Sequence, residues 1–308
     1  EYGCLVLRHA VNMGKGRALK DALNYYQVFL SRECSGVITA DCDGQHTVED
    51  IRRMGQAMEE HPDSLILGAR DFDQKNVPAK RRVGNKLTRT VMRLFYGGKI
   101  SDTQTGLRAI PNSLVEEYLT LPGERFEFET AMLLTALRRK TRIEEVPIQT
   151  VYLDGNKSTH FRPVADSWAI YKLILGTFFK YSLSSLSSCL IDFALFQLLL
   201  LALGSLSWEV KVTLATVGAR VCSSLYNYAV NRQLVFSRGR LGKGTFLKYY
   251  ILCAAQMLCS AGGVLLFCQW ARLPELPAKI VVDGVLFFIS YRIQRNWVFA
   301  ERGEREKS

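Results

Sequence analysis

Two carboxylates directly follow one of the most apolar short runs in the first half of the chain. Residues 37–40 read VITA, and DCDGQH follows at 41–46. In an extended chain, alternate side chains point the same way, so Asp41 and Asp43 share one side while Cys42 faces the other. Two like charges on one side need a counter-charge.

Three interpretations of DCDGQH compete. A calcium-binding EF-hand loop is excluded, because it needs Gly at its sixth position and Glu at its twelfth, where this chain has His46 and Arg52. A solvated turn is a second interpretation, since Asp and Gly are common turn residues. We favour a site for Mg²⁺ or Mn²⁺, held by the carboxylates and by substrate phosphates. The counter-charge is then a metal–diphosphate.

The stretch NMGKG at 12–16 places Lys15 between two glycines at the expected start of a helix. It lacks the spacing of a P-loop. Such a helix entry is either purely structural or brings an ammonium and free N–H groups towards an anion. The sequence leaves both interpretations open.

The elements that must position these residues alternate along the first half of the chain. We expect strands at 4–7, 36–40 and 64–69 and helices at 17–30 and 48–60, with a basic stretch from Lys80 onward. This alternation predicts a mainly parallel sheet covered by helices on both faces, with ligands beyond the carboxyl ends of its strands. DCDGQH lies at such an end.

A series of motifs carries a family resemblance. In order, residues 12–167 contain NMGKGRALKDAL, ITADCDGQH, LILGAR, SDTQTGLRAI, FEFETAMLL, IEEVPI and GNKSTHFRPVADS. This order resembles family 2 glycosyltransferases, especially the dolichyl- or undecaprenyl-phosphate sugar synthases. The resemblance implies an α/β GT-A (Rossmann-like) fold and sugar transfer from a nucleoside diphosphate to a polyprenyl phosphate. The family's first strand and its PxYNE motif have no counterpart, so we expect an N-terminally truncated domain.

The resemblance assigns roles to residues of the donor site. Asp41 and Asp43 match the DxD pair that binds the metal and the donor diphosphate, and Gln45 matches the Gln that follows this pair. Arg70 matches a basic residue that closes the next strand. Its planar fork suits phosphate oxygens. The metal, Arg70 and Lys15 are expected to neutralise the diphosphate leaving group.

Two further residues match the motif that follows. Asp102 matches the family's acid before (S/T)G(F/L)R, and Arg108 is the arginine of that motif, either a donor contact or part of a structural ion pair. The acceptor, a phosphate monoester with a second pKa of about 6, is already largely anionic at neutral pH. We therefore expect Asp102 to position the acceptor or a metal more than to remove a proton. Attack opposite the leaving group inverts the anomeric centre.

The second half of the chain is far more apolar than the first. The 308 residues carry a net charge of +11 and are 48% hydrophobic. We expect a catalytic domain at 1–165, an amphipathic juxtamembrane segment at 166–180 and a four-helix transmembrane domain at 181–308. The expected spans are 181–203, 211–232, 248–270 and 278–298. Arg220 and Asp283 weaken the second and fourth.

An internal repeat supports these two spans. TFFKY at 177–181 recurs as TFLKY at 245–249, and YAVNRQLVF at 228–236 recurs as YRIQRNWVF at 291–299. The pattern predicts a duplicated helical hairpin. It resembles the GtrA family, proposed to help translocate polyprenyl-phosphate sugars. Because charges inside a bilayer are usually paired or functional, we expect Arg220 to pair with Asp283 or Asp192.

Basic residues indicate the orientation in the membrane. They cluster at one set of helix ends and are nearly absent from the opposite loops, so the positive-inside rule places both termini and the catalytic domain in the cytoplasm, at the inner cell membrane. Eight cysteines without a CxxC pair suggest free thiols in a reducing compartment. The basic stretch from Lys80 is either a solvated helix face or a contact with anionic lipid. The transmembrane half disfavours nucleic acid as a partner.

The resulting functional prediction is a metal-dependent, inverting glycosyltransferase that uses a donor of the UDP-glucose or GDP-mannose type. Its partners are this donor, polyprenyl phosphate and the lipid bilayer, and the sequence leaves a homo-oligomer open. One alternative is a lipid-linked sugar translocase with an inactive or accessory glycosyltransferase domain. Another is a membrane half that serves only as an anchor, although Asp192, Arg220 and Asp283 are unusual residues for an anchor.

Overall fold

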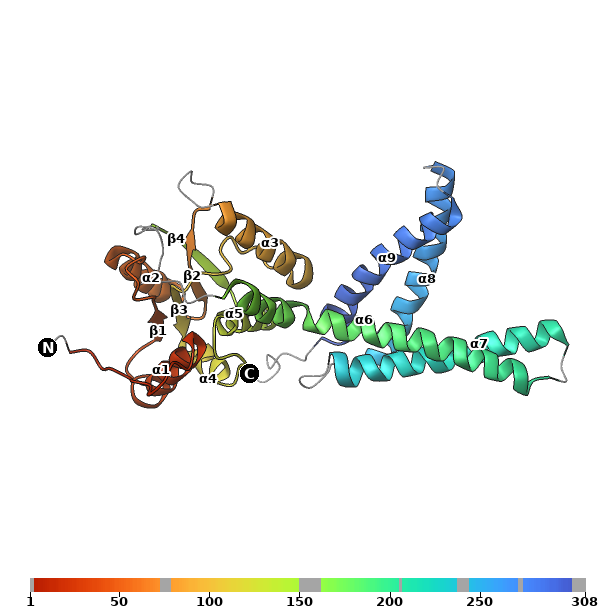
Figure 1. Cartoon of the computed structure of the whole chain (residues 1–308), viewed down its shortest axis with the longest axis horizontal. Coiled ribbons are helices and arrows are strands. Elements are labelled where there is room, and N and C mark those ends of the chain that lie inside the picture. The colour runs from red at the N-terminus through yellow and green to blue at the C-terminus, as the bar shows by residue number, and fades with distance from the viewer. Residues whose placement is uncertain are drawn as a thin grey trace. The chain divides into compact units, whose positions relative to one another are not determined.

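The computed structural model describes residues 3–72, 79–149, 162–204, 207–236, 244–270 and 274–300. The chain divides into two compact units, Glu1–Leu175 and Gly176–Ser308. This division falls inside the predicted juxtamembrane segment, which is part of one continuous helix, α6 (Pro163–Ala202). Figure 1 shows the elements of both units.

The first unit alternates helices and strands from residue 15 onward. Its elements are α1 (Lys15–Phe29), β1 (Gly36–Thr39), α2 (Val48–Glu60), β2 (Leu65–Arg70), α3 (Ala79–Tyr96), β3 (Arg108–Pro111), α4 (Asn112–Leu119), α5 (Glu127–Arg139), β4 (Ile143–Ile148) and the start of α6. The bounds of α2 are those predicted. Thr47 caps this helix, because its hydroxyl oxygen accepts a hydrogen bond of 3.1 Å from the backbone N–H of Asp50.

The sheet differs from the prediction in two respects. The strand expected at 4–7 is wrong, since these residues lie exposed and pair with no strand in the described part of the chain. The sheet is also mixed, with the order β1-β3-β2-β4. β3 is antiparallel to β1 and β2, whereas β2 and β4 are parallel. The connection through α3 leaves β2 and enters β3 at the same end of the strands, so β3 runs antiparallel to β2.

Alternation along the strands divides the core of this unit into two layers. Leu65 and Leu67 of β2 belong to a large cluster with α1, α3, α4, α5 and the start of α6. Ile66 lies between them in sequence and belongs to a smaller cluster beneath α2. Helices therefore cover both faces, as expected for a strand whose successive side chains point in opposite directions.

The second unit is helical. It contains the rest of α6, α7 (Trp208–Val230), α8 (Thr245–Trp270) and α9 (Glu275–Ile293), and π-helical segments follow α7 and α9 at Asn231–Val235 and Gln294–Val298. Among the described helices, α6 and α8 are long and apolar enough to cross a bilayer by hydropathy alone. α7 and α9, which correspond to the other two predicted spans, do not meet this criterion.

The sequence repeat appears in this unit as matched pairs of contacts. Tyr181 and Tyr249 are equivalent in the repeat, as are Tyr228 and Tyr291. The ring centroids of Tyr181 and Tyr291 lie 5.3 Å apart, and those of Tyr228 and Tyr249 lie at the same distance. Equivalent residues also meet each other: Phe236 stacks on Phe299 at 5.3 Å. The two hairpins are thus related by a pseudo-two-fold axis.

A buried amide pair lies on the same axis. Asn231 and Gln294 are equivalent in the repeat and begin the two π-helical segments. The side-chain amide of Asn231 donates a 3.1 Å hydrogen bond to Gln294 Oε1, and both residues are buried. Because buried amides are costly unless they are paired, this contact favours one register between the two hairpins.

Candidate active site

Motifs that are far apart in the sequence meet at one edge of the sheet. Asp41 follows the carboxyl end of β1, and Arg70 ends β2. Asp102 precedes β3, whose first residue, Arg108, pairs with Thr39 and with Leu67. Because β3 is antiparallel to both neighbours, the loop before it lies at the edge where β1 and β2 end. The mixed sheet therefore assembles the residues that a parallel sheet was expected to assemble.

The counter-charge of Asp41 is Lys15. The Lys15 ammonium lies 2.7 Å from Asp41 Oδ1 and 3.0 Å from Glu129 Oε1. Gly106 permits this arrangement, since a Cβ at this position would lie 2.6 Å from Asp41 Oδ2 and 3.0 Å from Lys15 Nζ. Lys15 at the start of α1, Asp41 after β1 and Glu129 on α5 thus form an ion-pair cluster.

The two carboxylates keep Lys15 charged. Burial alone would lower the pKa of its ammonium, but Glu129 and Asp41 together raise this pKa above its ordinary value. The side chain of Glu129 is 10% exposed, compared with 35% for Asp41. Lys15 is therefore a fixed positive charge between a buried and a more accessible carboxylate.

The glycines around Lys15 have a structural purpose that the sequence left open. Gly14 has a φ of 94°, and a Cβ there would lie 2.4 Å from the carbonyl oxygen of Glu124. A Cβ at Gly16 would come within 2.8 Å of Phe128 Cβ. The start of α1 thus packs directly on the backbone that leads into α5, which brings Lys15 to Glu129.

Gly14→Ala is expected to destabilise the first unit by about 2 kcal/mol or more. The substitution places a Cβ on a residue with positive φ and brings this Cβ into a clash with the backbone of Glu124. Thermal unfolding of the purified protein measures this effect. Gly84→Ala on α3 is the matched control, since a Cβ at Gly84 meets nothing within 4 Å and Ala favours a helix. An equal loss of stability in both variants would contradict the close-packing explanation.

Arg70 and Asp102 form a second charged pair. Arg70 donates from Nε to Asp102 Oδ2 at 2.6 Å and from Nη2 to Asp102 Oδ1 at 3.1 Å. Asp102 has no exposed side-chain surface, and Arg70 retains 18%. A buried carboxylate in such a two-pronged contact orients the guanidinium. Because Asp102 is fully buried against Arg70, the expected direct contact of Asp102 with the acceptor or a metal gains no support from this geometry.

Neighbouring elements hold the loop that carries Asp102. Glu145 of β4 accepts hydrogen bonds from the backbone N–H and the hydroxyl of Ser101, at 2.7 and 2.9 Å. The Asn85 side chain on α3 accepts a hydrogen bond from the backbone N–H of Thr103 at 3.3 Å. Sequence analysis gave neither Glu145 nor Asn85 a role, although Glu145 lies within the motif IEEVPI.

The remainder of DCDGQH forms a tight turn. Asp43 is exposed, and its Oδ1 accepts a 3.1 Å hydrogen bond from the backbone N–H of Gln45. The sequence did not indicate a place for the His46 side chain in this site. Burial lowers the pKa of its imidazole, and Arg70 and Lys15 lower it further, against the opposing effect of Asp41 and Asp43. His46 therefore lies within the electrostatic field of both charged pairs.

Arg108 lies behind this site. It is 1% exposed, and its guanidinium donates to the carbonyl oxygens of Thr105 at 3.0 Å and Glu129 at 2.6 Å. The predicted donor contact by Arg108 gains no support from these bonds. The bonds of Arg108 instead fix the α5 backbone at Glu129.

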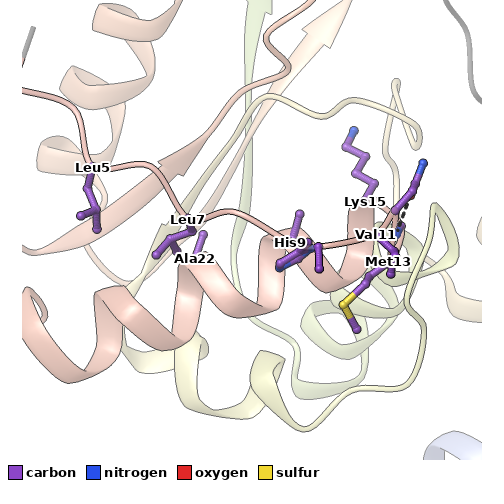
Figure 2. Close-up of a pocket in the computed structure, with 11 residues that line it drawn as sticks. Leu5, Leu7, His9, Val11, Met13, Lys15 and Ala22 are labelled. Atoms are coloured by element: carbon purple, nitrogen blue, oxygen red, sulfur yellow. Dashed lines mark hydrogen bonds between the residues drawn. The ribbon is translucent and has the colours of Figure 1, made fainter.

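An open groove adjoins the site. Leu5, Leu7 and Ala22 line it at one end and Lys15 at the other (Figure 2). Its volume is about 680 Å³, within the usual range for small-molecule pockets. The groove combines apolar side chains with the polar groups of His9, Asn12 and Lys15, and it reaches the ammonium that Asp41 also contacts.

The charged residues predicted in the membrane half occupy both hairpins. Arg220 Nη2 on α7 lies 3.4 Å from Asp192 Oδ2 on α6. Asp283 instead contacts Lys279, at 2.8 Å on the same helix, and accepts a hydrogen bond from Ser260 at 2.5 Å. Each hairpin thus contains one acid and one base in contact, and Arg220 pairs with Asp192 rather than with Asp283.

Comparison with known families agrees with both units. Residues 1–119 match the family described as glycosyl transferase family 2, and residues 180–299 match the GtrA/DPMS transmembrane domain. The chain joins a family 2 glycosyltransferase to a GtrA/DPMS transmembrane domain. It is therefore an enzyme and a membrane protein.

Curated relatives of this glycosyltransferase include proteins with dolichyl-phosphate acceptors. The chain is 27% identical over 181 residues to an uncharacterized protein of Methanocaldococcus jannaschii, covering 58% of this chain and 73% of the relative. It is 27% identical over 176 residues to the UDP-N-acetylglucosamine–dolichyl-phosphate N-acetylglucosaminyltransferase of Methanococcus voltae, covering 56% and 68%.

A eukaryotic relative matches over a shorter share of its length. The glycosyltransferase is 26% identical over 170 residues to the dolichyl-phosphate beta-glucosyltransferase of Drosophila melanogaster. This match covers 51% of the chain and 49% of the relative. The chain thus spans about half of that protein.

Asp41 and Asp43 of the glycosyltransferase suit a divalent cation whose remaining ligands come from the substrate. Within the described ranges, no three His, Cys, Asp or Glu side chains converge as a ready-made metal site. Mg²⁺ usually takes one or two protein carboxylates together with substrate phosphates. Asp41 fits this donor set, because 35% of its side chain is exposed, and Asp43 is exposed beside it.

Proposed function

We propose that this glycosyltransferase moves a sugar from a nucleoside-diphosphate sugar to a polyprenyl phosphate at the cytoplasmic face of the membrane, with inversion at the anomeric carbon. The observation that carries the proposal is the meeting of two charged clusters, Lys15–Asp41–Glu129 and Arg70–Asp102, at one edge of the sheet. The dolichyl-phosphate acceptors named for the Methanococcus and Drosophila relatives support it.

The donor diphosphate needs positive charge, which the metal, Lys15 and Arg70 would supply. Asp41 and Asp43 would hold Mg²⁺ or Mn²⁺, which neutralises charge on the diphosphate leaving group when bound. Lys15 and Arg70 add cations oriented by Glu129 and Asp102. We assign the uncharged part of the donor to the groove that ends at Lys15. Gln45 lies within the same turn as the two acids and completes the donor site.

The acceptor needs orientation more than deprotonation. A phosphate monoester is already an oxyanion near neutral pH, so a general base contributes little. Asp102 has no exposed surface and both of its oxygens accept from Arg70. We therefore assign Asp102 the role of holding Arg70, and Arg70 the role of aligning phosphate oxygens.

Sugar transfer in membranes from cells that express the protein tests this function. Radiolabelled UDP-glucose, UDP-N-acetylglucosamine or GDP-mannose is supplied with undecaprenyl or dolichyl phosphate and Mn²⁺. Label in the lipid fraction that requires both the protein and Mn²⁺ supports the proposal. A label-free lipid fraction with every donor would contradict it.

The ion pairs in the membrane half favour a second activity, translocation of the lipid-linked product. An anchor has no need of Asp192 and Arg220 within its spans, where a charge is costly. We assign this pair to the path of the lipid phosphate. It would work in series with the transferase.

Arg220→Ala is expected to reduce product translocation about five- to thirtyfold, which corresponds to the 1–2 kcal/mol of an interhelical polar contact in the membrane, while transfer at the cytoplasmic face continues. Proteoliposomes that report product at each face with a membrane-impermeant lectin measure both steps. Lys211→Ala, near the start of α7, is the control. Full translocation by Arg220→Ala would exclude the functional role.

A further inference from the structure

The ion-pair cluster around Lys15 contains one acid that the DxD motif does not account for. Glu129 lies on α5, 88 residues beyond Asp41 in the sequence, and its carboxylate is 3.0 Å from the Lys15 ammonium. Its backbone carbonyl accepts a 2.6 Å hydrogen bond from the buried Arg108 guanidinium. Glu129 is thus anchored from behind and directed towards Lys15.

The two acceptors of Lys15 differ in their other commitments. Under the proposed function, Asp41 binds the metal, and an ammonium 2.7 Å from Asp41 Oδ1 competes for that carboxylate. Asp41 Oδ2 faces Gly106, with no space there for even a Cβ. Glu129 has no such second role among the contacts that the structure describes, so it can retain Lys15 when Asp41 changes partner.

We propose that Glu129 is a positioning residue for the donor diphosphate. Lys15 serves as the counter-ion of Asp41 until the metal and donor bind. Glu129 then keeps the ammonium at the site, where it contacts the diphosphate instead. This inference rests on the proposed function and adds Glu129 to it.

The proposal predicts a change in diphosphate affinity that is opposite to the change expected from simple charge removal. Glu129→Gln removes a negative charge near an anionic ligand, which by itself would tighten diphosphate binding. If Glu129 acts by holding Lys15, the same variant weakens diphosphate binding, because the ammonium is no longer held. The loss would also depend on the presence of Lys15, as expected for residues coupled through one contact.

Binding of Mn²⁺ and of UDP or GDP to the purified full chain tests this prediction. Electron paramagnetic resonance reports free Mn²⁺, and calorimetry at saturating Mn²⁺ reports nucleoside-diphosphate affinity. The variants are Lys15→Met, Glu129→Gln and the double variant, with Glu116→Gln, an exposed acid on α4, as the matched control. Circular dichroism checks that each variant is folded.

We expect Glu129→Gln to weaken nucleoside-diphosphate binding about threefold or more, and Lys15→Met about tenfold, which correspond to about 0.7 and 1.4 kcal/mol of binding free energy. The double variant should match Lys15→Met alone. Lys15→Met should also bind Mn²⁺ more tightly without nucleotide, because the competitor of the metal is gone.

Three results would overturn the inference. Tighter or unchanged diphosphate binding by Glu129→Gln would show that its charge acts directly or not at all. A loss that adds to that of Lys15→Met would show that Glu129 acts independently of Lys15. Wild-type protein that binds neither Mn²⁺ nor either nucleotide would overturn both the inference and the proposed donor site, whereas the first two results leave the donor site standing.

Discussion

Asp43→Ala is expected to lower the rate of sugar transfer by about a thousandfold or more, since loss of metal binding removes several kcal/mol of charge stabilisation from the leaving group. Asp43 is exposed, and the hydrogen bond that it accepts comes from a neighbouring backbone N–H. Its removal should therefore leave the fold intact. Transfer of radiolabelled sugar to the lipid fraction measures the effect.

The matched control is Asp63→Ala, which removes an exposed acid outside the site. It should retain wild-type transfer. If Asp43→Ala keeps more than a tenth of the wild-type rate while Mn²⁺ is still required, the metal is held elsewhere, and the interpretation of DCDGQH as the metal site would be wrong.

Asp102→Asn is expected to cost about 3 kcal/mol of unfolding free energy together with most of the transfer activity. Arg70 would then lose the carboxylate that accepts two of its hydrogen bonds, and breaking one partner of a buried pair leaves an uncompensated charge. Thermal unfolding of the purified protein and the transfer assay measure the two effects.

A change on the other side of the pair separates folding from chemistry. Arg70→Lys keeps a positive charge beside Asp102 but loses the planar fork, so stability should fall less than in Asp102→Asn while transfer still falls strongly. If Arg70→Lys transfers sugar at the wild-type rate, Arg70 would be structural, and its assignment to the phosphate oxygens would have to be withdrawn.

Local patterns in the sequence predicted much of the fold. The helix predicted at 48–60 has the bounds of α2, and the apolar runs with their repeat predicted the hairpins of the membrane half. The direction of β3 could not be predicted, because it depends on how a connection of 37 residues, from 71 to 107, returns to the sheet. The strand expected at residues 4–7 was wrong, because a strand also requires a partner, and pairing depends on the tertiary structure.

The sequence by itself determined the chemistry that this protein has available: two acids after a buried strand, a lysine between glycines, an arginine at the end of the next strand and a duplicated hairpin. These are signals between near neighbours in the chain. Only the tertiary structure decided which partners meet, such as Asp41 with Lys15, Lys15 with Glu129, Arg70 with Asp102 and Arg220 with Asp192. Such pairs depend on strand register and helix packing, which join residues far apart in the sequence.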